Sequence, residues 1–143
     1  MIAALQRFVE AQDPVFDRVL SELRAGCKKT HWMWFVFPQI AGLGHSAMAQ
    51  KFAIASLNEA RAYLAHPVLG LRLKEATEAV LGHVNEWGQP RCSVHEIFGS
   101  PDDFKFHSSM TLFHRADTDE QLFSGALKSF FEGREDGETL KRI

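Results

Sequence analysis

Residues 118–133 read TDEQLFSGALKSFFEG, and their apolar pattern indicates the fold class more clearly than any other stretch of this chain. Thr118 and Gln121 have the spacing of a capping box, which is typical of a helix N-terminus, and Gly133 is the residue type that ends helices. The apolar residues between them recur at helical spacing and share one face: Leu122, Phe123, Ala126, Leu127, Phe130 and Phe131. These residues predict a helix that buries a broad apolar face.

A second helix is predicted near the beginning of the chain. Asp13 is a typical N-cap residue, and Pro14 suits the first helical position because the missing N–H group costs nothing there. The apolar residues that follow have the spacing i, i+3, i+4, i+7, and they are Phe16, Val19, Leu20 and Leu23. Gly26 then stands where a left-handed residue ends a helix.

Other segments follow the same helical pattern, and none shows sustained period-two alternation. Ser56–Glu59 is a capping box, residues 69–80 carry an apolar stripe, and Ser100–Asp103 resembles a helix start with Ser100 as the N-cap. Residues 32–37 are the one strand-like stretch, although their aromatic residues fit neither period. We therefore predict an all-α (mainly α) fold, a compact single domain spanning residues 1–143 with about six to eight short helices.

Composition excludes several classes of protein. Sixteen Lys and Arg residues against eighteen Asp and Glu residues give a net charge of -2, which does not indicate nucleic acid as a partner. The longest apolar run, Trp32–Pro38, is too short to span a membrane. Cys27 and Cys92 are isolated, and Met1–Val9 has no apolar run of signal-peptide length, so we expect a cytoplasmic protein.

No metal or cofactor is expected from the motifs. The chain has seven histidines, but only His107 and His114 share a helix face, and they are two turns apart. The zinc-protease, nucleophile-elbow and dinucleotide-binding motifs are all absent from the sequence. The pattern of residues leaves the oligomeric state open.

The segment 28–39 combines basic and aromatic residues. Lys28 and Lys29 run directly into His31, Trp32 and Trp34, and such a combination suits a flat, anionic ligand such as a nucleotide. The alternative is that the aromatic rings fill the core, which is their commoner fate, and that His31 is a hydrogen-bonded structural residue.

The segment 98–113 contains the second unusual pattern. On a helix, Lys105 lies beside Ser108 and Ser109, one turn further along, and such a lysine can hold an anion. The alternative is that Lys105 extends to water while the serines bond back to the helix. The helix start itself is not expected to bind phosphate, because Asp102 and Asp103 place negative charge there.

Several stretches carry a resemblance to a known family. They are residues 7–12, RFVEAQ; residues 31–39, HWMWFVFPQ; residues 42–46, GLGHS; residues 59–67, EARAYLAHP; and residues 98–105, FGSPDDFK. With these motifs the chain resembles the domain of unknown function numbered 1810. The resemblance implies a small, mainly α-helical single domain, and it implies no established activity and no catalytic residues.

Our leading hypothesis is a domain that binds a small anionic or nucleotide-like ligand. The motivation is that polar groups alternate with bulky aromatic rings in the two segments above, as a pocket requires. The candidate lining residues are His31, Trp32, Trp34, Gln39, Ser46, Gln50, Lys51, Lys105 and Ser109.

Two alternatives come from other functional classes. One is a hydrolase or transferase that acts on a nucleotide or ADP-ribosyl substrate, with Lys51 or Lys105 as the electrostatic or nucleophilic group and His31 as the acid or base. Residues 49–52, AQKF, are similar to a stretch of the ADP-ribose-linked glycohydrolase family associated with NAD metabolism. The other is a protein-interaction module, which predicts an exposed apolar patch and no pocket.

Overall fold

Helices make up nearly all of the regular structure in residues 2–143, the part of the chain that this computed structural model describes; within the first helix, side chains are described from Ala4 onward. Pairing of strand type is limited in these residues to two isolated bridges, Ile40 with Ile54 and Val84 with Pro90. The helices are α1 (Ile2–Gln12), α2 (Phe16–Ala25), α3 (Met33–Val36), α4 (Ala47–Lys51), α5 (Leu57–Ala65), α6 (Leu69–Leu81), α7 (Val94–Phe98), α8 (Asp102–Ala116), α9 (Gln121–Phe131) and α10 (Gly137–Leu140).

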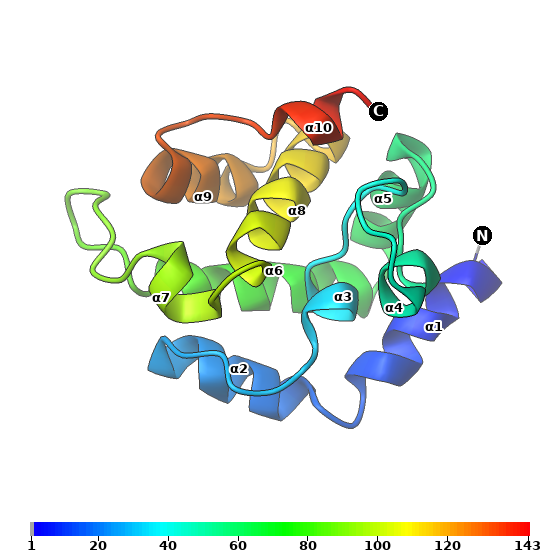
Figure 1. The fold of residues 1–143 in the computed structure, drawn as a ribbon, viewed down its shortest axis with the longest axis horizontal. Coiled ribbons are helices and arrows are strands. Elements are labelled where there is room, and N and C mark those ends of the chain that lie inside the picture. Colours follow the sequence, from blue (N-terminus) through cyan, green and yellow to red (C-terminus); the bar gives the residue numbers. More distant parts are fainter. Residues whose placement is uncertain (1) are drawn as a thin grey trace.

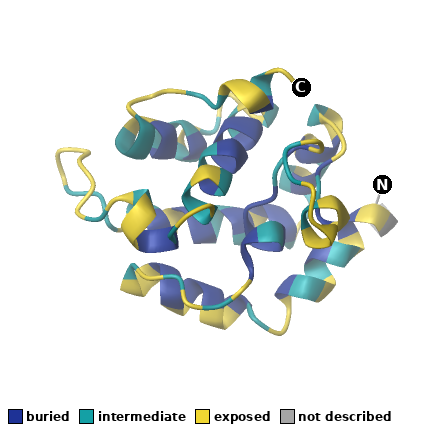
Figure 2. Cartoon of the chain, in the orientation of Figure 1, coloured by how far each residue is buried: buried dark blue, intermediate teal, exposed yellow. Residues whose placement is uncertain are grey.

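Two long helices, α6 and α8, organise the fold. Helix α6 packs against α2, α5 and α9, and α8 packs against α5, α7, α9 and α10 (Figure 1). The stripe predicted on residues 69–80 is buried, and it consists of Leu69, Leu73, Ala76 and Val80. One continuous apolar core lies between these helices, and the loop after α6 extends away from it into solvent (Figure 2). The prediction of a mainly α single domain is confirmed.

Helix α9 confirms the helix predicted from residues 118–133, although its first residue differs. It begins at Gln121, and the N-cap is Glu120, whose side chain accepts a hydrogen bond from the Leu122 amide. The expected cap at Thr118 is therefore wrong, because the acidic residue next to the helix takes that role. The helix ends at Phe131, and Gly133 follows with a φ of 77°.

Two further boundaries differ from the predictions. Helix α2 begins at Phe16 and its N-cap is Val15 without a side-chain bond, so the cap expected at Asp13 is wrong. Helix α8 has Pro101 as its N-cap, which excludes Ser100 from the role predicted for it. The predicted helix end at Gly26 is confirmed by its φ of 76°, and Ser56 caps α5 by accepting a hydrogen bond from the Glu59 amide.

The strand-like stretch of residues 32–37 contains a short helix. Met33–Val36 form α3, and Phe35, Phe37 and Trp32 are all buried in the core around it. The rings contact one another and aromatic residues from elsewhere in the chain; for example, the ring of Phe37 packs edge-on against that of Phe106 on α8, with centroids 5.0 Å apart. The segment is apolar on all sides because it passes through the middle of the molecule, which is why its period was ambiguous.

Helix α3 leads into a short excursion of the chain, residues 39–54, which begins and ends at nearly the same place. The Ala41 amide donates to the Ile54 carbonyl at 2.8 Å, and the Ile54 amide donates to the Gln39 carbonyl at 2.9 Å. Helix α4 lies within this excursion. Within residues 2–143, no helix combines the length and the apolar character that crossing a membrane requires.

Candidate functional site

Trp34 is the residue of the aromatic block that faces a cavity. The cavity has a volume of about 190 Å³, and it lies between α3 and the 39–54 excursion. Trp34 is half-buried there. The other lining residues are Gln39, Ile40, Ala41, Gly42, Gly44, Ala49, Gln50, Phe52 and Ala53. The excursion thus forms most of the wall, and Trp34 contributes the one large ring that is not fully buried.

Local hydrogen bonds hold the wall in place. Ser46 is the N-cap of α4 and accepts a hydrogen bond from the Ala49 amide, and the Gln50 side chain donates to the His45 carbonyl at 2.8 Å. From α1, the Arg7 guanidinium donates to the Lys51 carbonyl at 2.7 Å and to the Ala53 carbonyl at 2.8 Å. The wall of the cavity therefore consists of backbone that hydrogen bonds hold at several points.

Two glycines bring the backbone close to the cavity. Gly42 has a φ of 100°, in the left-handed region that favours glycine. At Gly44 an added Cβ atom would lie 2.5 Å from the Cβ of Ala49, so a larger residue would push α4 away. Close packing of the backbone around the cavity therefore explains why positions 42 and 44 are glycine.

Lys105 supplies positive charge next to Trp34. Its ammonium lies 5.2 Å from the centroid of the Trp34 ring, within the range of a cation–π contact. The carboxylate of Asp102 lies between two lysines, 2.9 Å from the Lys28 ammonium and 3.5 Å from that of Lys105. Two positive charges and one negative charge leave a surplus of one, and Lys105, at the longer distance, is the less neutralised cation.

Trp32 has a structural role. It is 1% exposed, and its indole N–H donates to the Glu22 carboxylate at 3.0 Å. Trp32 therefore fills the core, as the alternative interpretation of the aromatic segment expected. Trp32 is not one of the residues that line the cavity.

The other candidate residues lie in different surroundings. His31 and Lys51 are exposed, and neither lines the cavity. Ser46 acts as the cap of α4. Ser109 is fully buried, and its hydroxyl has no hydrogen-bond partner among the residues that the structure describes. The structure thus brings Trp34, Gln39 and Gln50 together in one cavity, with Lys105 against the Trp34 ring.

Glu22 on α2 was not anticipated from the sequence. Its carboxylate accepts hydrogen bonds from the amides of Lys29 and Thr30, from the Thr30 hydroxyl and from the Trp32 indole. Burial by itself would raise the pKa of Glu22, but these hydrogen bonds to the charged form outweigh it and lower the pKa to about 2. Glu22 therefore remains ionised and determines the path of residues 28–32 toward Trp34.

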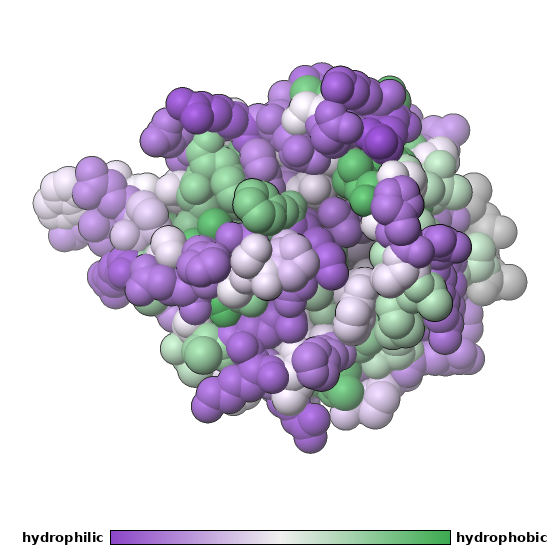
Figure 3. All heavy atoms as spheres, in the orientation of Figure 1, coloured by the Kyte–Doolittle hydropathy of each residue, from purple (hydrophilic) through white to green (hydrophobic). Residues whose placement is uncertain are grey.

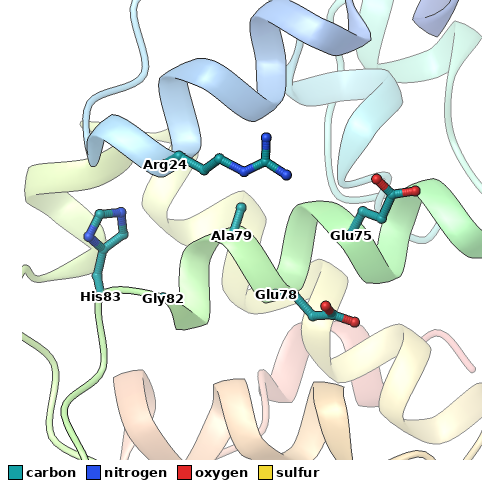
Figure 4. Close-up of a pocket in the computed structure, with 6 residues that line it drawn as sticks. All are labelled: Arg24, Glu75, Glu78, Ala79, Gly82 and His83. Carbon is teal, nitrogen blue, oxygen red and sulfur yellow. The ribbon is translucent and has the colours of Figure 1, made fainter.

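A second, more open cavity of about 350 Å³ lies between α2 and α6 (Figure 4). Arg24 extends from α2 above Ala79, and Glu75 and Glu78 lie along α6. The Nε2–H group of His83 donates to the Leu23 carbonyl at 2.7 Å, so this ring nitrogen already has a partner within the protein. None of the residues predicted to bind a ligand lines this cavity, and it contains no aromatic ring apart from that histidine.

Metal coordination finds no support in the arrangement of side chains. Within residues 2–143, no group of three or more His, Cys, Asp or Glu side chains is close enough together to hold a metal ion. The chemistry that the Trp34 cavity offers is therefore an aromatic surface, amide groups from two glutamines, and a nearby positive charge.

The fold and this cavity together define a small helical domain with a pocket of about 190 Å³ beside Trp34. The chain belongs to the family described as "Protein of unknown function (DUF1810)", which matches residues 2–143. This confirms the resemblance noted from the sequence motifs.

A solved structure has the same fold. It is the crystal structure of the conserved hypothetical protein Rv1873 from Mycobacterium tuberculosis, which is 50% identical in sequence, with a TM-score of 0.90. The match covers 97% of this chain and 95% of that one. No protein with a curated description matches the chain.

Proposed function

We propose that this protein binds a small ligand with a planar ring and a negative charge in the cavity beside Trp34. The observation that carries the proposal is the position of Trp34, whose ring lines the cavity and also contacts the ammonium of Lys105. A ring stacked on tryptophan and an anion near lysine are the two contacts that such a ligand requires.

The size of the cavity limits the ligand. Its volume of about 190 Å³ is below the roughly 300–1,000 Å³ of pockets that enclose drug-sized molecules. A single ring system such as a nucleobase fits this space, whereas a whole dinucleotide would extend out of it. The amides of Gln39 and Gln50 on the wall offer donors and acceptors for the edge of the ring.

The two alternatives receive less support from the arrangement of residues. An enzyme that uses His31 with Lys51 or Lys105 requires these groups in one cavity, but His31 and Lys51 are exposed and do not line the cavity beside Trp34. An interaction module requires a large apolar patch, but the most exposed apolar residues, Leu71, Trp87 and Phe104, lie on separate elements. Hydrophilic residues cover much of the face in Figure 3, and the apolar atoms on it lie in several separate areas, one of them over α8 and α9.

The cytoplasmic location stays a prediction. Cys27 and Cys92 are both free thiols, as is typical of proteins in a reducing compartment.

Fluorescence of Trp34 tests the proposal directly. Trp87 is 72% exposed on the loop after α6, so the variant Trp87→Phe removes its background and leaves the buried Trp32 and the half-buried Trp34. Titration of this variant with benzoate, orotate and phenyl phosphate is expected to quench Trp34, and Lys105→Gln is expected to weaken binding by about tenfold through loss of the cation.

The control is the double variant Trp34→Phe, Trp87→Phe, in which only Trp32 emits and quenching is expected to disappear. A probe at about a hundred times its dissociation constant is also expected to stabilise the fold by roughly 2.7 kcal/mol, which a thermal-shift assay detects. If none of the three probes changes Trp34 emission or the melting temperature, the proposal is wrong.

A further inference from the structure

We infer that Arg142 is a second anion-binding residue of the Trp34 cavity, and that the ligand is therefore a ring that carries a phosphate. This inference rests on the proposed function, and it adds the chemical class of the anion and the residue that selects it.

Arg142 is not itself one of the residues that line the cavity, but its side chain lies close to Gly42, which does line it. A Cβ atom added to Gly42, which lines the cavity, would be 3.0 Å from Nε of Arg142 and 3.4 Å from its Cδ atom. The side chain thus passes over the Gly42 backbone, and glycine is needed there both for its φ of 100° and for the space that Arg142 occupies. Arg142 comes from the opposite end of the sequence to Trp34 and reaches the cavity only through the fold.

The guanidinium of Arg142 has N–H groups that are not used in hydrogen bonds within residues 2–143. Both of its hydrogen bonds within residues 2–143 are made by Nη1, to the carbonyl of Glu138 at 2.8 Å and to the carboxylate of Glu138 at 3.2 Å. The Nε and Nη2 atoms form the other side of the fork, and this side binds two oxygens of a carboxylate or phosphate at once. Nε is also the atom nearest to Gly42, so the open side of the fork begins at the cavity wall.

Charge counting favours a dianion. The Glu138 carboxylate is shared by Lys141 at 2.8 Å and Arg142 at 3.2 Å, which leaves one surplus positive charge. Asp102 is shared in the same way by Lys28 and Lys105, which leaves another. Two clusters with one surplus charge each therefore flank one cavity, and a phosphate monoester matches both, because it carries a charge close to -2 at neutral pH.

Helix α8 holds both cations in position. Lys105 belongs to α8, and α10 packs against α8 (Figure 1). The Asp136 carboxylate accepts hydrogen bonds from the Ser108 hydroxyl at 3.1 Å and from the Thr139 hydroxyl at 2.6 Å, while its amide donates to the Thr111 hydroxyl at 2.9 Å. These hydrogen bonds connect α8, which carries Lys105, to the segment that leads through α10 to Arg142.

The experiment compares phenyl phosphate with benzoate, two probes with the same ring and different charge, by quenching of Trp34 in the Trp87→Phe background. We expect phenyl phosphate to bind at least about tenfold more tightly than benzoate. Arg142→Gln is expected to weaken the binding of phenyl phosphate more than that of benzoate, and thereby to remove most of this preference. Arg142→Lys keeps the positive charge but loses the fork of the guanidinium. Its preference for phenyl phosphate over benzoate is therefore expected to lie between that of the parent and that of Arg142→Gln.

The matched control is Arg134→Gln, because Arg134 is an exposed arginine that pairs with Glu132 and, unlike Arg142, has no atom within 4 Å of a Cβ added to Gly42. It is expected to change neither affinity. If Arg142→Gln keeps the melting temperature of the parent and the full preference for phenyl phosphate, the inference about Arg142 is wrong while the proposed function stands. If benzoate and phenyl phosphate bind equally in the parent, the ligand class inferred here is wrong. If neither probe quenches Trp34, the proposed function itself fails.

Discussion

Glu22 shows how one buried carboxylate determines the position of residues that are close to the cavity. It is 8% exposed, and its four donors all come from residues 29–32. An unpaired carboxylate in this position would be costly, so the segment takes the one path that supplies these donors. Trp32 is thereby directed into the core, and Trp34 is left at the cavity.

The acid sensitivity of the fold follows from the same carboxylate. The pKa of Glu22 is lowered from 4.5 to about 2, so its contribution to stability is complete above pH 4.5 and is lost as the pH falls toward 2. The shift corresponds to about 3 kcal/mol. Glu22→Gln is therefore expected to cost about 3 kcal/mol at pH 7 and clearly less at pH 3, measured by urea denaturation at both pH values.

The control for this prediction is Glu10→Gln, at an exposed position on α1. It is expected to leave the stability nearly unchanged at both pH values. An equal cost of Glu22→Gln at pH 7 and pH 3 would contradict the assignment of the ionised form to Glu22.

At the scale of elements, the close approach of α5 and α6 depends on a single glycine. Gly70 is buried in the first turn of α6, and a Cβ atom added there would lie 2.1 Å from the carbonyl oxygen of Leu64 at the end of α5. Backbone cannot move aside as a side chain can, so any larger residue separates the two helices. Sequence periodicity predicted both helices but contains no information about this distance.

A pair of glycine variants tests this contact. Gly70→Ala is expected to destabilise the protein by about 2–3 kcal/mol, because the added methyl group overlaps the α5 backbone. Gly125→Ala is the matched control: Gly125 lies inside α9 with nothing within 4 Å of an added Cβ, so alanine is expected to stabilise by about 0.5–1 kcal/mol. Chemical denaturation measures both, and equal effects would contradict the close packing described above.

At the scale of the whole molecule, one core connects nearly all of the helices. Buried apolar residues from α1, α2, α3, α5, α6, α7, α8 and α9 belong to the same cluster. No helix of this set buries its apolar face without the others, because each face is completed by residues from distant parts of the chain. A shared core of this kind is typical of a single cooperative unit.

Unfolding of the whole chain is therefore expected to occur in one step. Far-UV circular dichroism reports the helices, and the fluorescence of the buried Trp32 in the Trp87→Phe variant reports the core around α2 and α3. The two urea transitions are expected to coincide, with a calorimetric enthalpy equal to the van't Hoff enthalpy. Two separate transitions would show that the chain contains two folding units.

Local sequence patterns were sufficient to predict the helices, but they did not predict where several of these helices begin. The stripes in α2, α6 and α9 were predictable because an amphipathic period of 3.6 residues is a property of the sequence alone. The caps expected at Asp13, Ser100 and Thr118 were wrong because several neighbouring residues are able to begin a helix, and the packing of the helix on the core selects one of them. Ser93 and Glu96 form a capping box at the start of α7, and their spacing in the sequence is a local signal of that helix start.

The residues of the candidate site were much harder to predict from the sequence than the helices, because their positions depend on the fold. Lys105 and the aromatic segment were identified from residue types, since a cation beside aromatic rings is unusual in any context. Arg142 was not identified from the sequence, because only the packing of α10 against α8 brings it close to Gly42. Asp102 was predicted only to place negative charge at the helix start, and in the structure its carboxylate also neutralises part of the charge on Lys28 and Lys105.

The sequence by itself determined the helical class, the single domain and the unusual character of residues 28–39, because periodicity, length and composition act locally. Only the tertiary structure decided which tryptophan faces the cavity. Trp32 and Trp34 have the same chemistry and nearly the same neighbours in sequence, and their difference comes from partners elsewhere: Glu22 for one and Lys105 for the other. Burial and charge balance are properties of a three-dimensional neighbourhood, and contacts between distant residues create that neighbourhood.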